Sequence, residues 1–176
     1  IPPTLTNDLW QEKINIAQKD SLANYSFYMG TSNTNIEEIK KIDPQQVCGV
    51  KVFMGSSTGN LLVDDEKALE NIFSLSPVII TTHCEDTPLI SINEQSAIAK
   101  YGESIPIELH EEIRSRQACL NSTTKAIHLA KQFNSDLHVL HITTEDEIRL
   151  FNEGGIEGKK ITSEVCIPHL MFSSQD

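Results

Sequence analysis

Three side chains in the sequence, Lys51, His83 and His141, have types and positions that would suit a metal site. Lys51 lies inside the apolar stretch GVKVFM, His83 ends the stretch PVIITTH, and His141 ends the stretch DLHVLH. Taken alone, each histidine is more often structural than functional. At equivalent ends of neighbouring strands, however, the pair favours metal ligation, because zinc prefers imidazoles that converge from a rigid scaffold.

Lys51 is the more unusual residue, because its strand is expected to be buried on both faces. Lysine is almost never fully buried without a partner, and an unpaired ammonium group there would be costly or would lose its proton. One interpretation is that Lys51 is paired with a carboxylate at the end of the strand. The other is a neutral amine that adds carbon dioxide and becomes a carbamate, an anionic oxygen ligand able to bridge two metal ions about 3.5–4 Å apart.

These residues must be positioned by an alternating series of helices and strands. Runs of β-branched and apolar residues predict five strands, over residues 24–29, 48–54, 77–83, 136–143 and 161–167. Apolar residues at helical spacing predict the helices, over residues 6–19, 34–42, 65–73, 114–133 and 144–151.

Polar residues mark the helix starts and the connections. Asn35 and Glu38, and again Thr144 and Glu147, have the spacing of a capping box. Residues 87–112 are predicted to form a long polar connection. The stretch GSSTGN after the second strand is predicted to be a loop, which either folds over a substrate or is a plain connection.

Strict alternation implies parallel strands joined by helical crossovers, in either a doubly wound sheet or part of an eight-stranded barrel. A doubly wound dinucleotide-binding fold would need a glycine-rich turn after its first strand. The stretches MGTSN and MGSSTGN do not provide that turn. We therefore predict an α/β fold of the (β/α)8 TIM-barrel class, with five strands forming an incomplete barrel.

In such a barrel, functional side chains gather at the carboxyl ends of the strands. Along LHVLH, the period of two places Leu137, Val139 and His141 on one face and His138 on the other. Only one of the two histidines can then face the barrel interior, and its position at the strand end favours His141. His138 is accordingly expected to pack under a helix.

Two acids and two arginines lie near the candidate ligands. Glu85 and Asp86 follow His83 after a single cysteine, just beyond the predicted strand. Solvated or helix-capping carboxylates are the more common outcome there, and support of a metal-bound histidine is the alternative. Arg114 and Arg116 begin the long helix, where salt bridges at the surface are expected.

The overall composition restricts the function classes. The chain has 176 residues, with 25 acidic against 14 basic side chains and a formal charge of −11. This balance argues against nucleic acid or an anionic membrane as a partner, and no apolar run is long enough to span a bilayer. The four cysteines are widely spaced and lie in or beside apolar stretches. They suggest reduced, buried thiols in a cytoplasmic protein.

Five stretches, in this order and spacing, resemble one known family: CGVKVFMGSSTGN, THCED, IRSRQACLNSTTKAIHLA, LHVLHIT and TSEVCIPHL. They resemble the central portion of the barrel in dihydroorotases. Those enzymes belong to the cyclic amidohydrolase superfamily, together with dihydropyrimidinases, hydantoinases and allantoinases. The resemblance covers essentially the whole chain. CIPHL departs from the more usual CPHHL of the family, so His169 is given no role.

The resemblance implies a fold and a metal site. The chain would supply about strands three to seven of the barrel, and residues 1–176 would form a single partial catalytic domain that lacks the first, second and eighth strands. Lys51 would be the carboxylated lysine of the fourth strand, which is both a catalytic residue and a metal ligand. His83 and His141 would be the metal ligands of the fifth and sixth strands. The cofactor would be two zinc ions, bridged by the carboxylated lysine and hydroxide.

The resemblance also implies an activity, the reversible conversion of dihydroorotate and N-carbamoyl-L-aspartate in pyrimidine biosynthesis. The family's His-x-His pair and its late aspartate are not in this sequence, so the isolated piece is expected to be inactive. Two alternatives stay open, another cyclic amidase (dihydropyrimidinase, hydantoinase or allantoinase type) and a non-catalytic structural or binding protein. The expected partner is a small-molecule substrate. The unpaired edges of an incomplete sheet would favour a homo-oligomer. The alternative is that disordered segments of the chain are missing from the structure.

Overall fold

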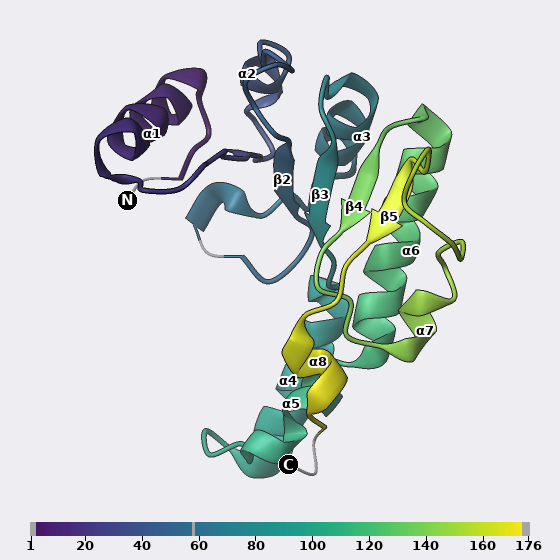
Figure 1. Cartoon of the computed structure of the whole chain (residues 1–176). Helices are drawn as coiled ribbons and strands as arrows, with labels where there is room; N and C mark the ends of the chain where they lie inside the picture. Colours follow the sequence, from purple (N-terminus) through teal and green to yellow (C-terminus); the bar gives the residue numbers. More distant parts are fainter. Residues whose placement is uncertain (1–2, 58, 174–176) are drawn as a thin grey trace.

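The structure is a computed structural model that describes residues 3–57 and 59–173. Its centre is a sheet of five parallel strands (Figure 1), whose spatial order is the same as their order in the chain. The strands are β1 Met29–Gly30, β2 Val50–Phe53, β3 Ile80–His83, β4 Leu137–Val139 and β5 Ile161–Ser163. The helices are α1 Asn7–Asp20, α2 Ile36–Ile39, α3 Glu66–Leu75, α4 Thr87–Tyr101, α5 His110–Ile113, α6 Arg116–Phe133, α7 Glu145–Ile148 and α8 Ile167–Met171, with short 3-10 turns at Gly59–Leu61 and Ile107–Leu109.

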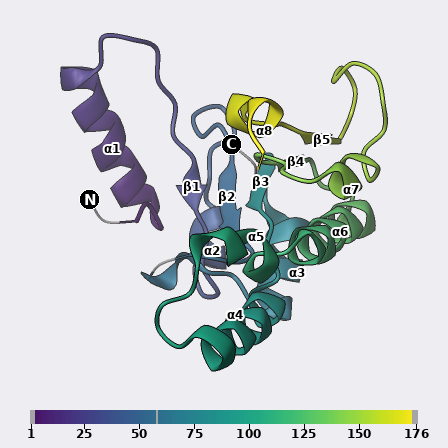
Figure 2. The same cartoon turned by 90° about the horizontal axis from the view of Figure 1, so that it is seen from below.

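The strand order decides between the two predicted architectures. A doubly wound sheet reverses its strand order and carries helices on both faces. Here each strand pairs with its predecessor, and α2, α3 and α6 lie along the same side of the sheet (Figures 1 and 2). The sheet is therefore part of the wall of a (β/α)8 barrel, as the sequence predicts.

The outer face of the sheet packs against the helices and forms the hydrophobic core. Alternate strand residues are almost completely buried on this side: Val50, Val52, Ile80, Leu137 and Val139. The helices supply apolar partners: Leu69, Ile72 and Phe73 from α3, and Ala126, Ile127 and Ala130 from α6. Burial of apolar surface, at about 25 cal/mol per Å², is the main force that holds these helices on the sheet.

The inner face of the sheet carries polar side chains in register. Lys51 pairs with Thr81, Thr81 with His138, and His138 with Thr162. Paired residues of a parallel sheet project to the same side. A row of polar groups therefore crosses the inner face, which is the face that a barrel directs towards its centre.

Several predicted elements are confirmed. The helices predicted over residues 6–19, 65–73 and 114–133 correspond to α1, α3 and α6. The capping box predicted at Thr144 is complete, because its hydroxyl accepts a hydrogen bond from the Glu147 backbone N–H while the Glu147 carboxylate accepts one from the Thr144 backbone N–H. Thr58, in the loop predicted after the second strand, lies outside the described residues.

The strand predicted over residues 24–29 is wrong for most of its length, because only Met29 and Gly30 pair with β2. The aromatic residues that suggested a strand pack locally instead. Trp10 from α1 donates its indole N–H to the carbonyl oxygen of Phe27 at 3.1 Å. That carbonyl is satisfied by a side chain, and the segment runs beside α1 rather than along the sheet.

The capping box predicted at Asn35 and Glu38 is also wrong. The Asn35 side chain instead accepts a hydrogen bond from the Ser32 backbone and donates to the carbonyls of Leu5 and Gly30. The Glu38 carboxylate accepts hydrogen bonds from Asn7 at the start of α1. Both residues tie separate segments together, which the local spacing does not reveal.

The connection predicted over residues 87–112 contains a helix of 15 residues, α4. It was missed because its apolar residues do not follow one face, and only Ala97 among them is buried. Asp86 caps the helix by accepting a hydrogen bond from the Leu89 backbone. No helix in the described part of the chain is both long and apolar enough to cross a membrane.

The last predicted strand is shorter than expected. Pairing with β4 stops at Ser163, and α8 begins at Ile167. Pro168 in the first turn of α8 explains the change, because proline fits the start of a helix but cannot donate to a sheet. The free cysteines also differ from the prediction of buried thiols, since only Cys84 is buried and Cys48 is exposed.

Candidate functional site

His83 and His141 meet at the carboxyl edge of the sheet. His83 is the last residue of β3, and His141 follows β4, which pairs with β3. Nδ1 of His83 lies 3.2 Å from Nε2 of His141. The two rings meet edge to face, with centroids 4.9 Å apart. The sequence prediction that these two residues converge is confirmed, although the path by which His141 arrives there is different.

His141 reaches His83 because the chain leaves the sheet two residues before His141. β4 ends at Val139, and His141 has a positive φ of 39°, which is uncommon for a residue other than glycine. This turn breaks the alternation from which the face of His141 was predicted. His138 is the residue that keeps strand geometry, and it lies on the inner face, not under a helix as predicted.

His138 is held there by polar neighbours from β5 and the segment that follows it. Its Nδ1 lies 2.8 Å from the Thr162 hydroxyl, and its Nε2 lies 3.3 Å from the Glu164 carboxylate. The most economical arrangement has the Thr162 hydroxyl donating to Nδ1 and the Nε2–H donating to Glu164. His138 is therefore a satisfied polar residue beside the candidate site.

Glu85 holds the outer nitrogen of His83. The Glu85 side chain is almost fully buried, and its Oε2 lies 2.7 Å from His83 Nε2. Arg114 donates a hydrogen bond to the same oxygen. Burial alone would raise the pKa of Glu85, but hydrogen bonds from His83 and Ser56 and the charge of Arg114 outweigh burial and lower the pKa to about 2. Glu85 is therefore a carboxylate at neutral pH.

The prediction that Glu85 and Asp86 are solvated or capping residues is thus right for Asp86 and wrong for Glu85. Asp86 caps α4, and its other oxygen accepts a hydrogen bond from Asn121 at 3.0 Å. The salt bridge expected for Arg114 is present, but its partner is the almost buried Glu85 and not an acid at the surface. The sequence offered no signal for this pairing, because 29 positions separate Arg114 from Glu85.

Lys51 has no carboxylate partner at ion-pair distance among the residues that the structure describes. Its ammonium group lies over the ring of Phe53, 4.5 Å from the centroid. Burial lowers the pKa of Lys51 to about 8, although Cys84 and Glu164 act in the opposite direction. The interpretation of Lys51 as half of an ordinary buried ion pair is therefore not supported by its surroundings.

The pKa of His141 depends on both other candidate ligands, His83 and Lys51. Burial lowers the pKa of His141, and the charges of His83 and Lys51 lower it further. A hydrogen bond between the ring and its own backbone acts in the opposite direction. The net effect favours the neutral imidazole, which is the form that binds metal ions.

The two histidines fit a zinc ion. Two nitrogens at tetrahedral positions, each about 2.0–2.1 Å from zinc, lie about 3.3 Å apart, close to the 3.2 Å between His83 Nδ1 and His141 Nε2. The outer nitrogen of His83 is held by Glu85, as is usual for metal-bound histidines. Within the described residues, no group of three or more His, Cys, Asp or Glu side chains is arranged to hold a metal. A third ligand on this chain would therefore have to be of another type, such as a carboxylated Lys51.

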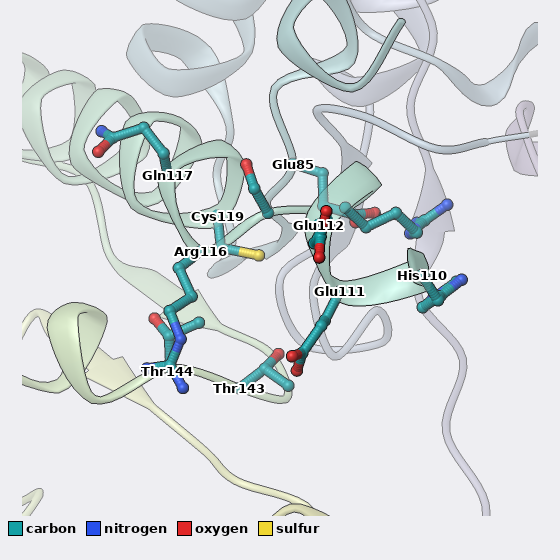
Figure 3. A pocket seen from close by; sticks show the side chains of 11 residues that line it. Glu85, His110, Glu111, Glu112, Arg116, Gln117, Cys119, Thr143 and Thr144 are labelled. Carbon is teal, nitrogen blue, oxygen red and sulfur yellow. The ribbon is translucent and has the colours of Figure 1, made fainter. Parts of the chain in front are cut away.

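Two cavities open beside these residues. One, of about 360 Å³, is lined by His83 and His141, and the other, of about 540 Å³, by residues of α5, α6 and the loop after β4. Glu85 and Arg114 line both cavities. Figure 3 shows the second cavity, with Arg116 on one side and Glu111 on the other. There is thus room for a small molecule next to the histidine pair.

Comparisons with known proteins found relatives of this chain. No family model matches the chain. A dihydroorotase from Methanosphaera stadtmanae is 29% identical over 177 residues, which cover 98% of this chain and 38% of that protein. An allantoinase from Deinococcus radiodurans is 23% identical over 186 residues, which cover 99% of this chain and 40% of that protein.

The solved structure of an L-hydantoinase (dihydropyrimidinase) from Arthrobacter aurescens superposes with a TM-score of 0.83 at 24% identity, over 93% of this chain and 37% of that one. Over almost its whole length, the chain is similar to members of the cyclic amidohydrolase superfamily. The chain spans about two fifths of the length of the curated relatives it matches. Its matches include dihydroorotases, allantoinases and hydantoinases, so they do not select one member of that superfamily.

Proposed function

We propose that this chain forms the central part of the catalytic barrel of a metal-dependent cyclic amidohydrolase, with Lys51, His83 and His141 as metal ligands. The observation that carries the proposal is the 3.2 Å separation of His83 Nδ1 and His141 Nε2 at the carboxyl edge of the sheet. Functional side chains of barrel enzymes gather at that edge. Residues 1–176 would then be one partial barrel domain, completed by strands outside this sequence.

Lys51 would act as a carbamate. Carbon dioxide adds to the neutral amine, which loses a proton as the carbamate forms. A lysine without a carboxylate partner and with a pKa of about 8 offers more neutral amine near neutral pH than an ordinary lysine does. As a carbamate, Lys51 would be an anionic oxygen ligand and would help the two histidines to hold zinc. An unmodified ammonium group could not ligate a metal at all.

The residues of this chain would divide the remaining tasks. When bound, zinc would lower the pKa of a water molecule towards neutrality and polarise the substrate carbonyl. His83 and His141 would hold one ion through the two nitrogens that already face each other. Glu85 would keep His83 oriented, and the adjoining cavities would receive the substrate.

For the substrate, we favour dihydroorotate, interconverted with N-carbamoyl-L-aspartate, which is a step of pyrimidine biosynthesis. Support comes from the sequence motifs and from the relative named dihydroorotase, which has the higher identity of the two relatives described above. The alternative is a dihydropyrimidinase, hydantoinase or allantoinase. The superposition on an L-hydantoinase favours this alternative. All of these reactions open or close a cyclic amide.

We also propose a cytoplasmic location, since all four cysteines are free thiols and none is paired in a disulfide. Reduced thiols are typical of that compartment. A homo-oligomer remains our expectation from the two edges of the sheet. Sedimentation of the purified full-length protein would measure its oligomeric state.

The proposal is tested by assaying the full-length protein, with zinc supplied, against dihydroorotate, dihydrouracil, hydantoin and allantoin. Turnover of dihydroorotate in preference to the others is expected. Preference for another ring would transfer the assignment to that cyclic amidase, and absence of turnover with all four would leave a non-catalytic protein as the better explanation.

Lys51→Ala provides the internal test of the metal site. Loss of bound zinc and of turnover is expected, because one of the proposed ligands is removed. Lys160→Ala is the matched control, since Lys160 is an exposed lysine whose ammonium group donates to the carbonyl of Asn134. Retention of zinc and activity in Lys51→Ala would contradict the assignment of Lys51.

A further inference from the structure

We infer that Glu85, held in place by Arg114, is a positioning residue that determines which nitrogen of His83 faces the metal. The inference rests on the proposed function, because it concerns a ligand of the proposed metal site. It goes further by assigning a specific task to Glu85 and by adding Arg114, for which the sequence predicted only a salt bridge at the surface. Neither residue would contact zinc or substrate in this task.

The direction of the hydrogen bond is set by chemistry. An ionised carboxylate can only accept, so the proton in the contact between His83 Nε2 and Glu85 Oε2 must be on the histidine. A neutral imidazole carries one N–H, and its other nitrogen then has a lone pair. Nδ1 of His83 is therefore the unprotonated nitrogen, and it is the one that lies 3.2 Å from His141.

Arg114 also holds the Glu85 carboxylate in place. It donates to the same Oε2 that receives the His83 proton. The Glu85 side chain is 8% exposed and the Arg114 side chain 35% exposed. An almost buried carboxylate needs a cation or several donors nearby to remain charged. Arg114 is one of these groups, and it does not occupy the space between the two histidines.

The backbone also fixes Glu85 in place. A Cβ atom added to Gly55 would lie 2.2 Å from the carbonyl oxygen of Glu85, so the loop after β2 packs directly against this residue. Glu85 is thus held from three directions, by the loop that follows the Lys51 strand, by His83 and by Arg114. A carboxylate fixed in this way can orient an imidazole more exactly than a mobile one can.

The adjacent Asp86 offers a matched comparison. It is also a carboxylate just beyond the same strand, but its hydrogen bonds go to Leu89 and Asn121, and none goes to either histidine. Asp86→Asn removes one negative charge from the same neighbourhood while keeping a residue able to cap α4. The change should leave His83 unaffected.

The first measurement needs no variant. Nitrogen-15 NMR of the imidazoles in metal-free full-length protein at pH 8 should show His83 with a proton on Nε2 and none on Nδ1. A proton on Nδ1 would overturn the inference, whether or not the protein binds zinc.

The second measurement is the affinity for Zn²⁺ alone, in wild type and in Glu85→Leu, Glu85→Gln and Asp86→Asn. Glu85→Leu should bind zinc about 10–100-fold more weakly, as is typical when such a support is lost. Glu85→Gln keeps an oxygen that can accept from Nε2–H, so it should recover part of that loss. Asp86→Asn should bind like wild type.

The outcomes distinguish a failure of the inference about Glu85 from a failure of the proposed function. Wild-type affinity in Glu85→Leu would overturn the inference and leave the proposed function standing. Equal losses in Glu85→Leu and Glu85→Gln, with an unchanged tautomer in both, would show that Glu85 acts only through its charge, and this would also overturn the inference. A wild-type protein that binds no zinc would overturn the proposed function, and the tautomer measurement would still decide the role of Glu85.

Discussion

Nδ1 of His83 and Nε2 of His141 lie 3.2 Å apart, although the two residues leave the sheet in different ways. His83 ends its strand in regular register with Phe53. His141 lies beyond the end of its strand and has a positive φ of 39°. The contact therefore depends on a local turn as much as on the sheet.

Lys51→Met should stabilise the metal-free protein, because a thioether replaces a partly buried ammonium group that has no carboxylate partner within residues 3–57 and 59–173. A gain of about 0.5–2 kcal/mol is the usual size for such optimising substitutions, often at the expense of function. Urea unfolding of the metal-free full-length protein would measure it. Lys67→Met, at an exposed lysine of α3, is the control and should change little.

The gain should also depend on pH. The pKa of Lys51 is about 8 in the folded protein, against 10.5 for the ordinary side chain. Between these values the unfolded wild type binds more protons than the folded one, so its stability rises with pH. The advantage of Lys51→Met should therefore be full below about pH 8 and shrink towards pH 10.5. An advantage that grows with pH would contradict the assigned direction.

Gly55→Ala should be strongly destabilising, because the new methyl group would lie 2.2 Å from a backbone oxygen of Glu85. The backbone would have to move, and overpacking of this kind costs about 1–3 kcal/mol. Gly155→Ala is the control, since nothing lies within 4 Å of its added Cβ. Thermal unfolding of both variants would measure the difference, and equal melting temperatures would refute the close approach.

Glu147→Gln should destabilise the chain by about 1–3 kcal/mol, the cost of leaving buried polar groups unsatisfied. Glu147 is 2% exposed, and its carboxylate accepts from the hydroxyls of Thr123 and Thr144 and from the Thr144 backbone. An amide cannot accept at both positions. Denaturant unfolding would compare it with Glu145→Gln, which alters an exposed ion pair with Arg149 worth about 0.3–0.5 kcal/mol.

Glu38→Gln should reduce stability at neutral pH and have no effect in strong acid. Hydrogen bonds from Lys41 and Asn7 lower the pKa of Glu38 to about 2, from 4.5. A depressed carboxyl pKa adds stability above pH 4.5 that is lost as pH falls towards 2. Unfolding curves between pH 2 and 7 would show wild type and variant converging in acid. Glu37→Gln, at an exposed residue paired with Lys40, should show a smaller change.

Much of the fold could be predicted because its signals are local. The period of α6 and the buried β-branched runs of β2 and β3 each lie within one stretch of sequence. The convergence of His83 and His141 also follows from a general property of parallel strands.

The rest depends on contacts between distant residues. The period of two misassigned His138, because it assumes that a strand continues to His141, and the strand ends at Val139. α4 was missed because most of its apolar residues stay exposed, so no single face is marked in the sequence. The pairing of Arg114 with Glu85 has no local signal at all.

The strand order has a consequence for the order in which the chain folds. Because each strand joins the one that precedes it in the sequence, the sheet can grow in the direction of synthesis, one strand-and-helix unit at a time. No early strand must wait for a late one, so few long loops have to close before pairing begins. The pocket that joins β3 and β4 would then be assembled only when the second half of the chain has emerged.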